Sequence, residues 1–71
     1  MTITDVRKSR TGLWVITDDR GTKYATKHAR HAEKATRAKA HGWPVAILDG
    51  RGWFYRELLA IEIVKQREAC A

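Results

Sequence analysis

Apolar, β-branched and aromatic side chains are concentrated in four short stretches of this chain, as they are in β-strands. The four stretches are residues 13–17, 22–25, 45–48 and 53–56. Residues 18–21 and 49–52 separate the members of each pair, and their Asp and Gly residues favour tight turns. The pattern therefore predicts two β-hairpins, one in each half of the chain.

Small and apolar side chains recur at helical spacing in residues 25–42, which we expect to form the one long helix. One side of this helix is made of small residues: Ala25, Ala29, Ala32, Thr36 and Ala40. Thr26 is placed to cap the start of the helix, and Gly42 followed by Pro44 ends it. Because an alanine face has little bulk, we expect it to lie close against a sheet.

The two ends of the chain have weaker patterns. Residues 2–8 alternate weakly and predict an extra N-terminal strand at the edge of the sheet. Residues 57–71 fit two structures, since the spacing of Leu58 and Ile61 suits a helix whereas the alternation of Leu59 with Ile61 suits a strand. Their length and their Leu, Glu, Gln and Lys content favour a short C-terminal helix, with a tail as the alternative.

Together these elements predict one small α+β domain, residues 1–71, with an antiparallel sheet in ββαββ order and the helix on one face. The large side chains expected beneath the helix are Trp14, Ile16, Val45, Ile47, Trp53 and Tyr55. The other sheet face is apolar as well, with Leu13, Val15, Ala46, Leu48 and Phe54. One helix cannot cover both faces, so we expect a homodimer joined through this second face or the C-terminal tail. A monomeric mass in sedimentation would contradict it.

Charge is concentrated in one part of the chain. The net charge of +6 comes from residues 20–41, where seven Lys and Arg face one Glu, while the flanking segments are each balanced. A local positive field of this kind attracts anions, most often nucleic acid or an acidic protein.

The cations of the predicted helix recur at spacings of three and four residues and form a row about 15 Å long. They are Lys27, Arg30, Lys34 and Arg37. We expect this basic helix face to contact the phosphates of nucleic acid, and Arg20 and Lys23 of the first hairpin to add contacts. The same pattern also suits a solvated face that keeps a small alanine-rich protein in solution.

Other chemistry has little support in the sequence. His28 and His31 have the spacing of some metal-binding pairs, but no Cys, Asp or Glu follows at the spacing of a zinc site. The single cysteine, Cys70, has no activating base near it in sequence. The chain has no glycine-rich phosphate loop and no nucleophile elbow. Most of the six aromatic side chains are needed for the core, which leaves few to stack on bases. We therefore expect no enzyme activity, no cofactor and no metal.

The N-terminus lacks the charged lead and apolar run of a signal peptide, and no apolar stretch is long enough to span a membrane. We expect a cytoplasmic protein that does not bind membranes.

Several local motifs resemble those of known families. They are Trp14 in an apolar strand, residues 25–27 at the helix entry, His41-Gly42 at the helix end, and residues 49–52 in the second turn. With these motifs, residues 12–57 resemble a small uncharacterised bacterial ββαββ domain family, a likeness that implies a fold and no activity. Residues 6–41 also resemble the arm-type DNA-binding domain of tyrosine recombinases, which implies DNA binding.

The sequence thus favours a small non-enzymatic nucleic-acid-binding or regulatory protein that uses its basic helix face. The alternative is a protein–protein interaction module, or a structural homodimer that binds an acidic partner and no nucleic acid.

Overall fold

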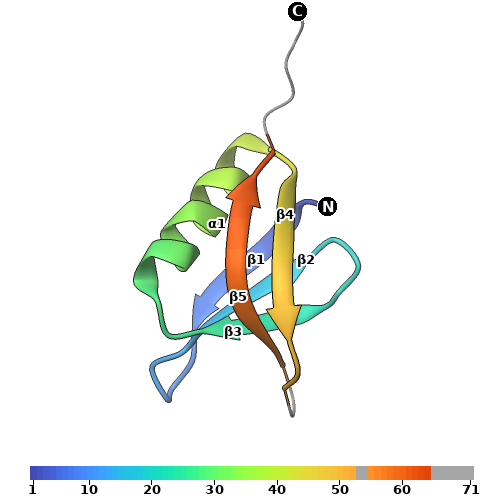
Figure 1. The fold of residues 1–71 in the computed structure, drawn as a ribbon. Helices are drawn as coiled ribbons and strands as arrows, with labels where there is room; N and C mark the ends of the chain where they lie inside the picture. Colours follow the sequence, from blue (N-terminus) through green and yellow to red (C-terminus); the bar gives the residue numbers. More distant parts are fainter. Residues whose placement is uncertain (53–54, 65–71) are drawn as a thin grey trace, which may run out of the picture.

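The computed structural model describes residues 1–52 and 55–64 of the chain. In this part the fold is α+β, with a five-stranded sheet and one helix (Figure 1). In chain order the elements are β1 (Ile3–Lys8), β2 (Trp14–Asp18), β3 (Lys23–Thr26), α1 (Ala29–His41), β4 (Val45–Gly50) and β5 (Arg56–Ile63). The extra N-terminal strand is confirmed as β1.

The sheet is mixed, so the prediction of a wholly antiparallel sheet was wrong. The strand order is β1-β2-β3-β5-β4, and every neighbouring pair is antiparallel except β3 with β5. After β3 the chain crosses over through α1 to the far edge, forms β4, and returns as β5 between β4 and β3. Because the hairpin between β4 and β5 then reverses the chain, β5 runs parallel to β3.

The sheet is curled, so that its two edge strands, β1 and β4, come together at one corner. The Val45 amide at the start of β4 donates a hydrogen bond of 2.7 Å to the carbonyl oxygen of Met1, just before β1. Figure 1 shows β4 and β5 crossing the other three strands steeply, with α1 running beside β5. The concave side of the curled sheet therefore encloses the core against the helix.

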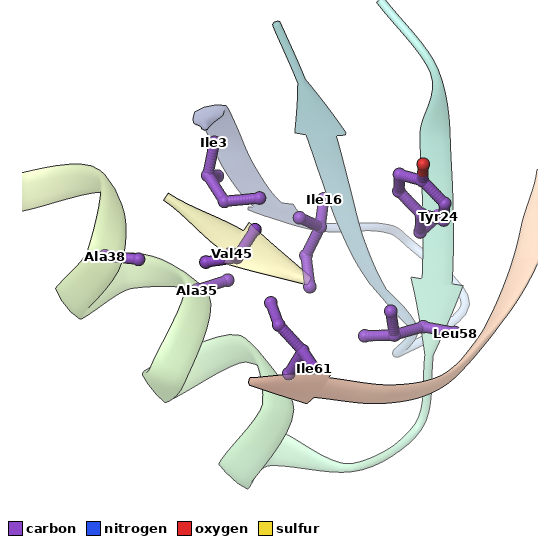
Figure 2. Packing of buried hydrophobic residues seen from close by; sticks show 8 residues of the cluster. All are labelled: Ile3, Ile16, Tyr24, Ala35, Ala38, Val45, Leu58 and Ile61. Atoms are coloured by element: carbon purple, nitrogen blue, oxygen red, sulfur yellow. The ribbon is translucent and has the colours of Figure 1, made fainter. Parts of the chain in front are cut away.

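The core is small and draws on all six elements. Its buried members are Ile3, Ile16, Tyr24, Ala35, Ala38, Val45, Leu58 and Ile61 (Figure 2). The helix supplies only alanines, while the sheet supplies the large side chains. Of the core predicted from sequence, Ile16 and Val45 are buried and Ile47 packs at the edge of the cluster.

Other predicted core residues are less buried or lie outside the described part. Trp14 is half-buried beside α1. Tyr55 is 41% exposed and precedes β5, so its assignment to the core and to a strand was wrong. Trp53 and Phe54 lie outside the described residues. On the outer face, away from α1, Leu48 and Ala46 are exposed, as predicted for a second apolar face.

The helix is shorter than predicted and is rotated about its axis. It begins at Ala29, and its buried residues are Ala32, Ala35 and Ala38. Ala29, Thr36 and Ala40 are exposed, which corrects the predicted buried face at these positions. Since the helix has alanine on two sides, alanine alone does not fix its rotation, and packing against the large sheet side chains decides it.

The predicted helix end is confirmed. Gly42 has φ 69°, a left-handed conformation that glycine adopts without strain. The backbone amides of Gly42 and Trp43 donate to the carbonyl oxygens of Lys39 and Ala38, respectively. These bonds satisfy carbonyls that the last helical turn leaves without partners.

The predicted C-terminal helix is a strand over its described part. β5 covers residues 56–63 and pairs with β4 on one side and β3 on the other. Leu58 and Ile61 both face the core, because an irregularity in the pairing near Leu59 shifts the alternation. Hydrogen bonding to two neighbours thus outweighs the local preference for helix. Residues 65–71, with Cys70, lie outside the described part.

A buried carboxylate holds the first hairpin. Asp18 is 2% exposed, and its side chain accepts hydrogen bonds from the backbone amides of Arg20 and Thr22 and from the Tyr24 hydroxyl. The sequence predicted a turn here, and the structure shows that the side chain of Asp18 also reaches into the core. No helix in the described residues is long and apolar enough to cross a membrane.

Candidate nucleic-acid interface

Three cations gather on the side of α1 that lies beside β5. Arg30, Lys34 and Arg37 are all exposed and line one shallow hollow of about 220 Å³, together with Glu33 and Ile63 of β5. We call Arg30, Lys34 and Arg37 the basic flank. Their spacings of four and three residues bring them to one side of the helix, as the sequence predicted.

In the described residues, no carboxylate forms an ion pair with the basic flank. Within residues 1–52 and 55–64, the ion pairs are Arg7 with Asp5 at 2.7 Å and Arg56 with Asp49 at 3.2 Å. Neither pair includes a residue of the basic flank. Within this described part, the guanidinium groups of Arg30 and Arg37 thus form no ion pair with a carboxylate, although Glu33 lines the same hollow.

Lys34 has a second role in the fold. Its Nζ donates a hydrogen bond of 3.3 Å to the carbonyl oxygen of Ile61 in β5. This bond fixes the ammonium group between the helix and the strand. The charge of Lys34 still lies at the surface, but its position is less free than that of the two arginines.

Lys27 and Thr26 lie before the helix rather than within it. The residue that caps α1 is His28, whose side chain makes no capping hydrogen bond, so the prediction of Thr26 as the cap was wrong. The Thr26 hydroxyl instead accepts from the His28 amide at 3.1 Å and lies 3.2 Å from Nδ1 of His31. Lys27 lies two residues before Ala29, the first residue of α1, so it is not part of the row of cations on the helix.

The two histidines near this end pack against each other. The rings of His28 and His31 are 5.2 Å apart in an edge-on arrangement. Burial lowers the pKa of His31, and the nearby positive charges of His28, Arg30 and Lys34 lower it further. His31 is thus held neutral beside the basic flank. No group of three or more potential metal ligands occurs in the described part of the chain.

The remaining two predicted contact residues lie elsewhere. Lys23 lies with Arg7 and Thr17 in a separate hollow of about 580 Å³. It pairs across the sheet with Thr17, next to the buried pair of Ile16 and Tyr24, so it faces away from the helix. Arg20 is exposed in the turn between β2 and β3. The six predicted residues therefore do not form one surface.

The structure also shows a hollow that the sequence did not reveal. It has a volume of about 270 Å³ and lies where β3 ends and α1 has not yet begun. Its lining combines apolar and polar groups: Leu13, Ala25, Thr26, Lys27, His28, Tyr55, Glu57, Leu58 and Leu59. We call it the β3–β5 hollow. The parallel pairing of Ala25 with Glu57 creates it, and no local sequence signal predicts a contact at that separation.

The other end of α1 carries a second aromatic contact. The rings of His41 and Trp43 are stacked, with centroids 4.1 Å apart and planes 11° from parallel. Lys39 and His41 form the last basic turn of the helix, where positive charge is favoured by the helix dipole.

Comparison of the chain with models of protein families, with curated proteins and with solved structures gives no match. The resemblances to a ββαββ family and to recombinase arm-type domains therefore stay predictions, and the function is argued from the site alone.

Proposed function

We propose that this chain is a small non-enzymatic nucleic-acid-binding protein that contacts the phosphate backbone with its basic flank. The observation that carries the proposal is the grouping of Arg30, Lys34 and Arg37 around one hollow without a carboxylate paired to any of them in the described residues. Free surface cations grouped in this way supply most of the affinity of non-specific nucleic-acid binding.

The three side chains suit phosphate in different ways. A guanidinium group donates two parallel hydrogen bonds to a phosphate, while an ammonium group acts as a point charge. Lys34 is held by Ile61, so its charge is positioned before any ligand arrives. Arg30 and Arg37 lie about 10 Å apart along the helix axis at 1.5 Å per residue, on either side of Lys34. The row therefore fits successive phosphates of one strand.

The end of the helix near Arg30 supports anions as well. The first turn of α1 contains no acidic residue, and His28 provides no side-chain cap. The positive end of the helix dipole is thus not offset within the helix itself. This contribution is small compared with that of the three cations.

A charge-matched pair of variants tests the proposal. Replacing both flank arginines, Arg30→Gln with Arg37→Gln, should weaken binding to a fluorescein-labelled DNA duplex by about tenfold or more in low salt. Fluorescence anisotropy measures the affinity. Lys34 is left unchanged, because its bond to Ile61 also supports the fold.

The control removes the same charge from exposed turns. Arg10 and Arg51 are exposed, lie between strands and do not line the hollow of the basic flank. The Arg10→Gln, Arg51→Gln variant has the same net charge as the flank variant and should bind nearly as well as the unchanged chain. Equal losses in both variants would mean that overall charge, rather than the basic flank, causes binding.

A different surface favours the alternative function, a structural homodimer. Leu48 and Leu59 are 61% and 48% exposed on adjacent strands. If the chain binds no nucleic acid even in low salt and sediments as a dimer that Leu48→Lys disrupts, self-association through the outer face is the better account.

A further inference from the structure

The β3–β5 hollow lies next to the basic flank along the same strand. Leu58 and Leu59 of β5 line the hollow, while Ile63 of β5 lines the flank. Lys34 reaches Ile61, between the two. The distance along β5 from Ile61 to Leu59 is about 7 Å at 3.3 Å per residue. One ligand can therefore contact both the basic flank and the β3–β5 hollow.

The shape of the hollow follows from the sheet. β3 forms only two pairs with β5, at Tyr24 and Ala25, and then leaves the sheet, whereas β5 continues to Ile63. Beyond Thr26, no strand of the described residues thus lies on the side of β5 opposite β4, until the helix covers that side. The space left there has a floor of apolar side chains, of which Leu58 is only 3% exposed.

The walls of the hollow suit a flat, polar, aromatic ligand. Tyr55 and His28 each present an aromatic ring, and Tyr55 is 41% exposed. Lys27 supplies hydrogen-bond donors and Glu57 supplies acceptors. A nucleobase is complementary to these groups, because it stacks on aromatic rings and carries both acceptors and donors on its edge. The volume of about 270 Å³ lies below the range of about 300–1,000 Å³ found for drug-sized ligands, which favours a single base.

We infer that the β3–β5 hollow binds one unpaired nucleobase of a single strand whose phosphates lie on the basic flank. The base stacks on Tyr55 over the floor of Leu58 and Leu59. Lys27 donates to a base carbonyl, and Glu57 accepts from a base N–H. This inference rests on the proposed function and narrows it, because bases in a duplex are stacked and paired and cannot enter the hollow.

Two DNA probes separate the base contact from the phosphate contact. One is a labelled single strand of about 12 thymidines, within the site sizes known for single-strand binders. The other has the same length and the same phosphates but carries abasic sites in place of all internal bases. We expect the unchanged chain to bind the thymidine strand about tenfold more tightly than the abasic strand.

Variants of Tyr55, which lines the β3–β5 hollow and also the hollow that contains Lys23, test the stacking contact. Tyr55→Ala should remove the preference for the thymidine strand and leave binding to the abasic strand unchanged. Tyr55→Phe keeps the ring and should keep the preference. Arg30→Gln with Arg37→Gln should weaken binding to both probes by the same factor, because both contain the phosphates.

The outcomes distinguish the two proposals. Equal affinity of the unchanged chain for both probes overturns the base-binding inference and leaves phosphate binding intact. A preference for thymidine that survives Tyr55→Ala places the base contact elsewhere and also overturns the inference. Absence of binding to either probe in low salt overturns both the inference and the proposed function.

Discussion

Asp18 is the residue on which the first hairpin depends most. Its buried carboxylate accepts three hydrogen bonds, two from turn amides and one from the Tyr24 hydroxyl. Burial and the bond to Asp18 together raise the pKa of Tyr24, so its hydroxyl stays protonated as a donor. A sequence pattern of Asp-Asp-Arg-Gly predicts a turn, but it does not show which Asp is buried.

Removing this carboxylate should destabilise the fold. Asp18→Ala leaves three donors without an acceptor and should lower the free energy of unfolding by roughly 2–4 kcal/mol. Urea denaturation measures it. The neighbouring Asp19 is exposed, so Asp19→Ala should cost less than about 0.5 kcal/mol. Similar losses for the two variants would show that Asp18 does not have the role described.

His31 should make stability depend on pH. Its pKa is lowered in the folded state by burial and by the charges of His28, Arg30 and Lys34. As the pH falls below about 6.5, the unfolded state therefore binds a proton at His31 that the folded state does not. The free energy of unfolding should decrease with falling pH until the folded-state pKa is passed.

The variant His31→Gln removes this titration. Urea denaturation between about pH 7.5 and pH 5 should show a smaller loss of stability in the variant than in the unchanged chain. Identical pH profiles for the two chains would contradict the lowered pKa of His31.

At the scale of the elements, local signals predicted much of what is observed. The first hairpin, the extra strand β1, the helix and its end at Gly42 all follow from residues that are close together in the sequence. The position of Arg30, Lys34 and Arg37 on one side of α1 follows from helical spacing alone. These features could be predicted because each depends on neighbours within one or two turns of chain.

Features that depend on distant parts of the chain could not be predicted in the same way. β5 is a strand because β3 and β4 supply hydrogen-bond partners on both sides, although the composition of its residues favours a short helix. The sequence predicts that Lys23 adds phosphate contacts to those of the helix cations. Its neighbour Tyr24 faces the core, however, so Lys23 lies on the sheet face away from the helix. That signal was present in the alternation of the strand.

The rotation of α1 gives a direct test at this scale. Ala35 is fully buried whereas Ala40 is exposed. The face predicted from sequence includes Ala40 and does not include Ala35. Ala35→Leu should overpack the core and lower the free energy of unfolding by about 1–3 kcal/mol. Ala40→Leu should change it by less than about 0.5 kcal/mol. A larger loss for Ala40→Leu than for Ala35→Leu in thermal or urea denaturation would support the buried helix face predicted from sequence.

At the scale of the whole molecule, the cations of the basic flank lie apart from the buried residues of the core. The core lies between the concave side of the sheet and the alanines of α1, and no residue of the basic flank belongs to it. The outer face of the sheet exposes Leu48 and Leu59 and remains the surface on which a homodimer is predicted. Arg30 and Arg37 can therefore lose their charge without loss of the core.

The measurement that tests the central claim most directly is the salt dependence of DNA binding. The logarithm of the binding constant should fall linearly with the logarithm of the salt concentration, because bound cations release counterions from the phosphates. Each cation that contacts a phosphate contributes about 0.9 to the slope for duplex DNA. The Arg30→Gln, Arg37→Gln variant should therefore have a slope smaller in magnitude by about 1.8. The Arg10→Gln, Arg51→Gln control should keep the slope of the unchanged chain. Equal slopes for the flank variant and the unchanged chain would show that the two arginines do not contact phosphate, and would contradict the account.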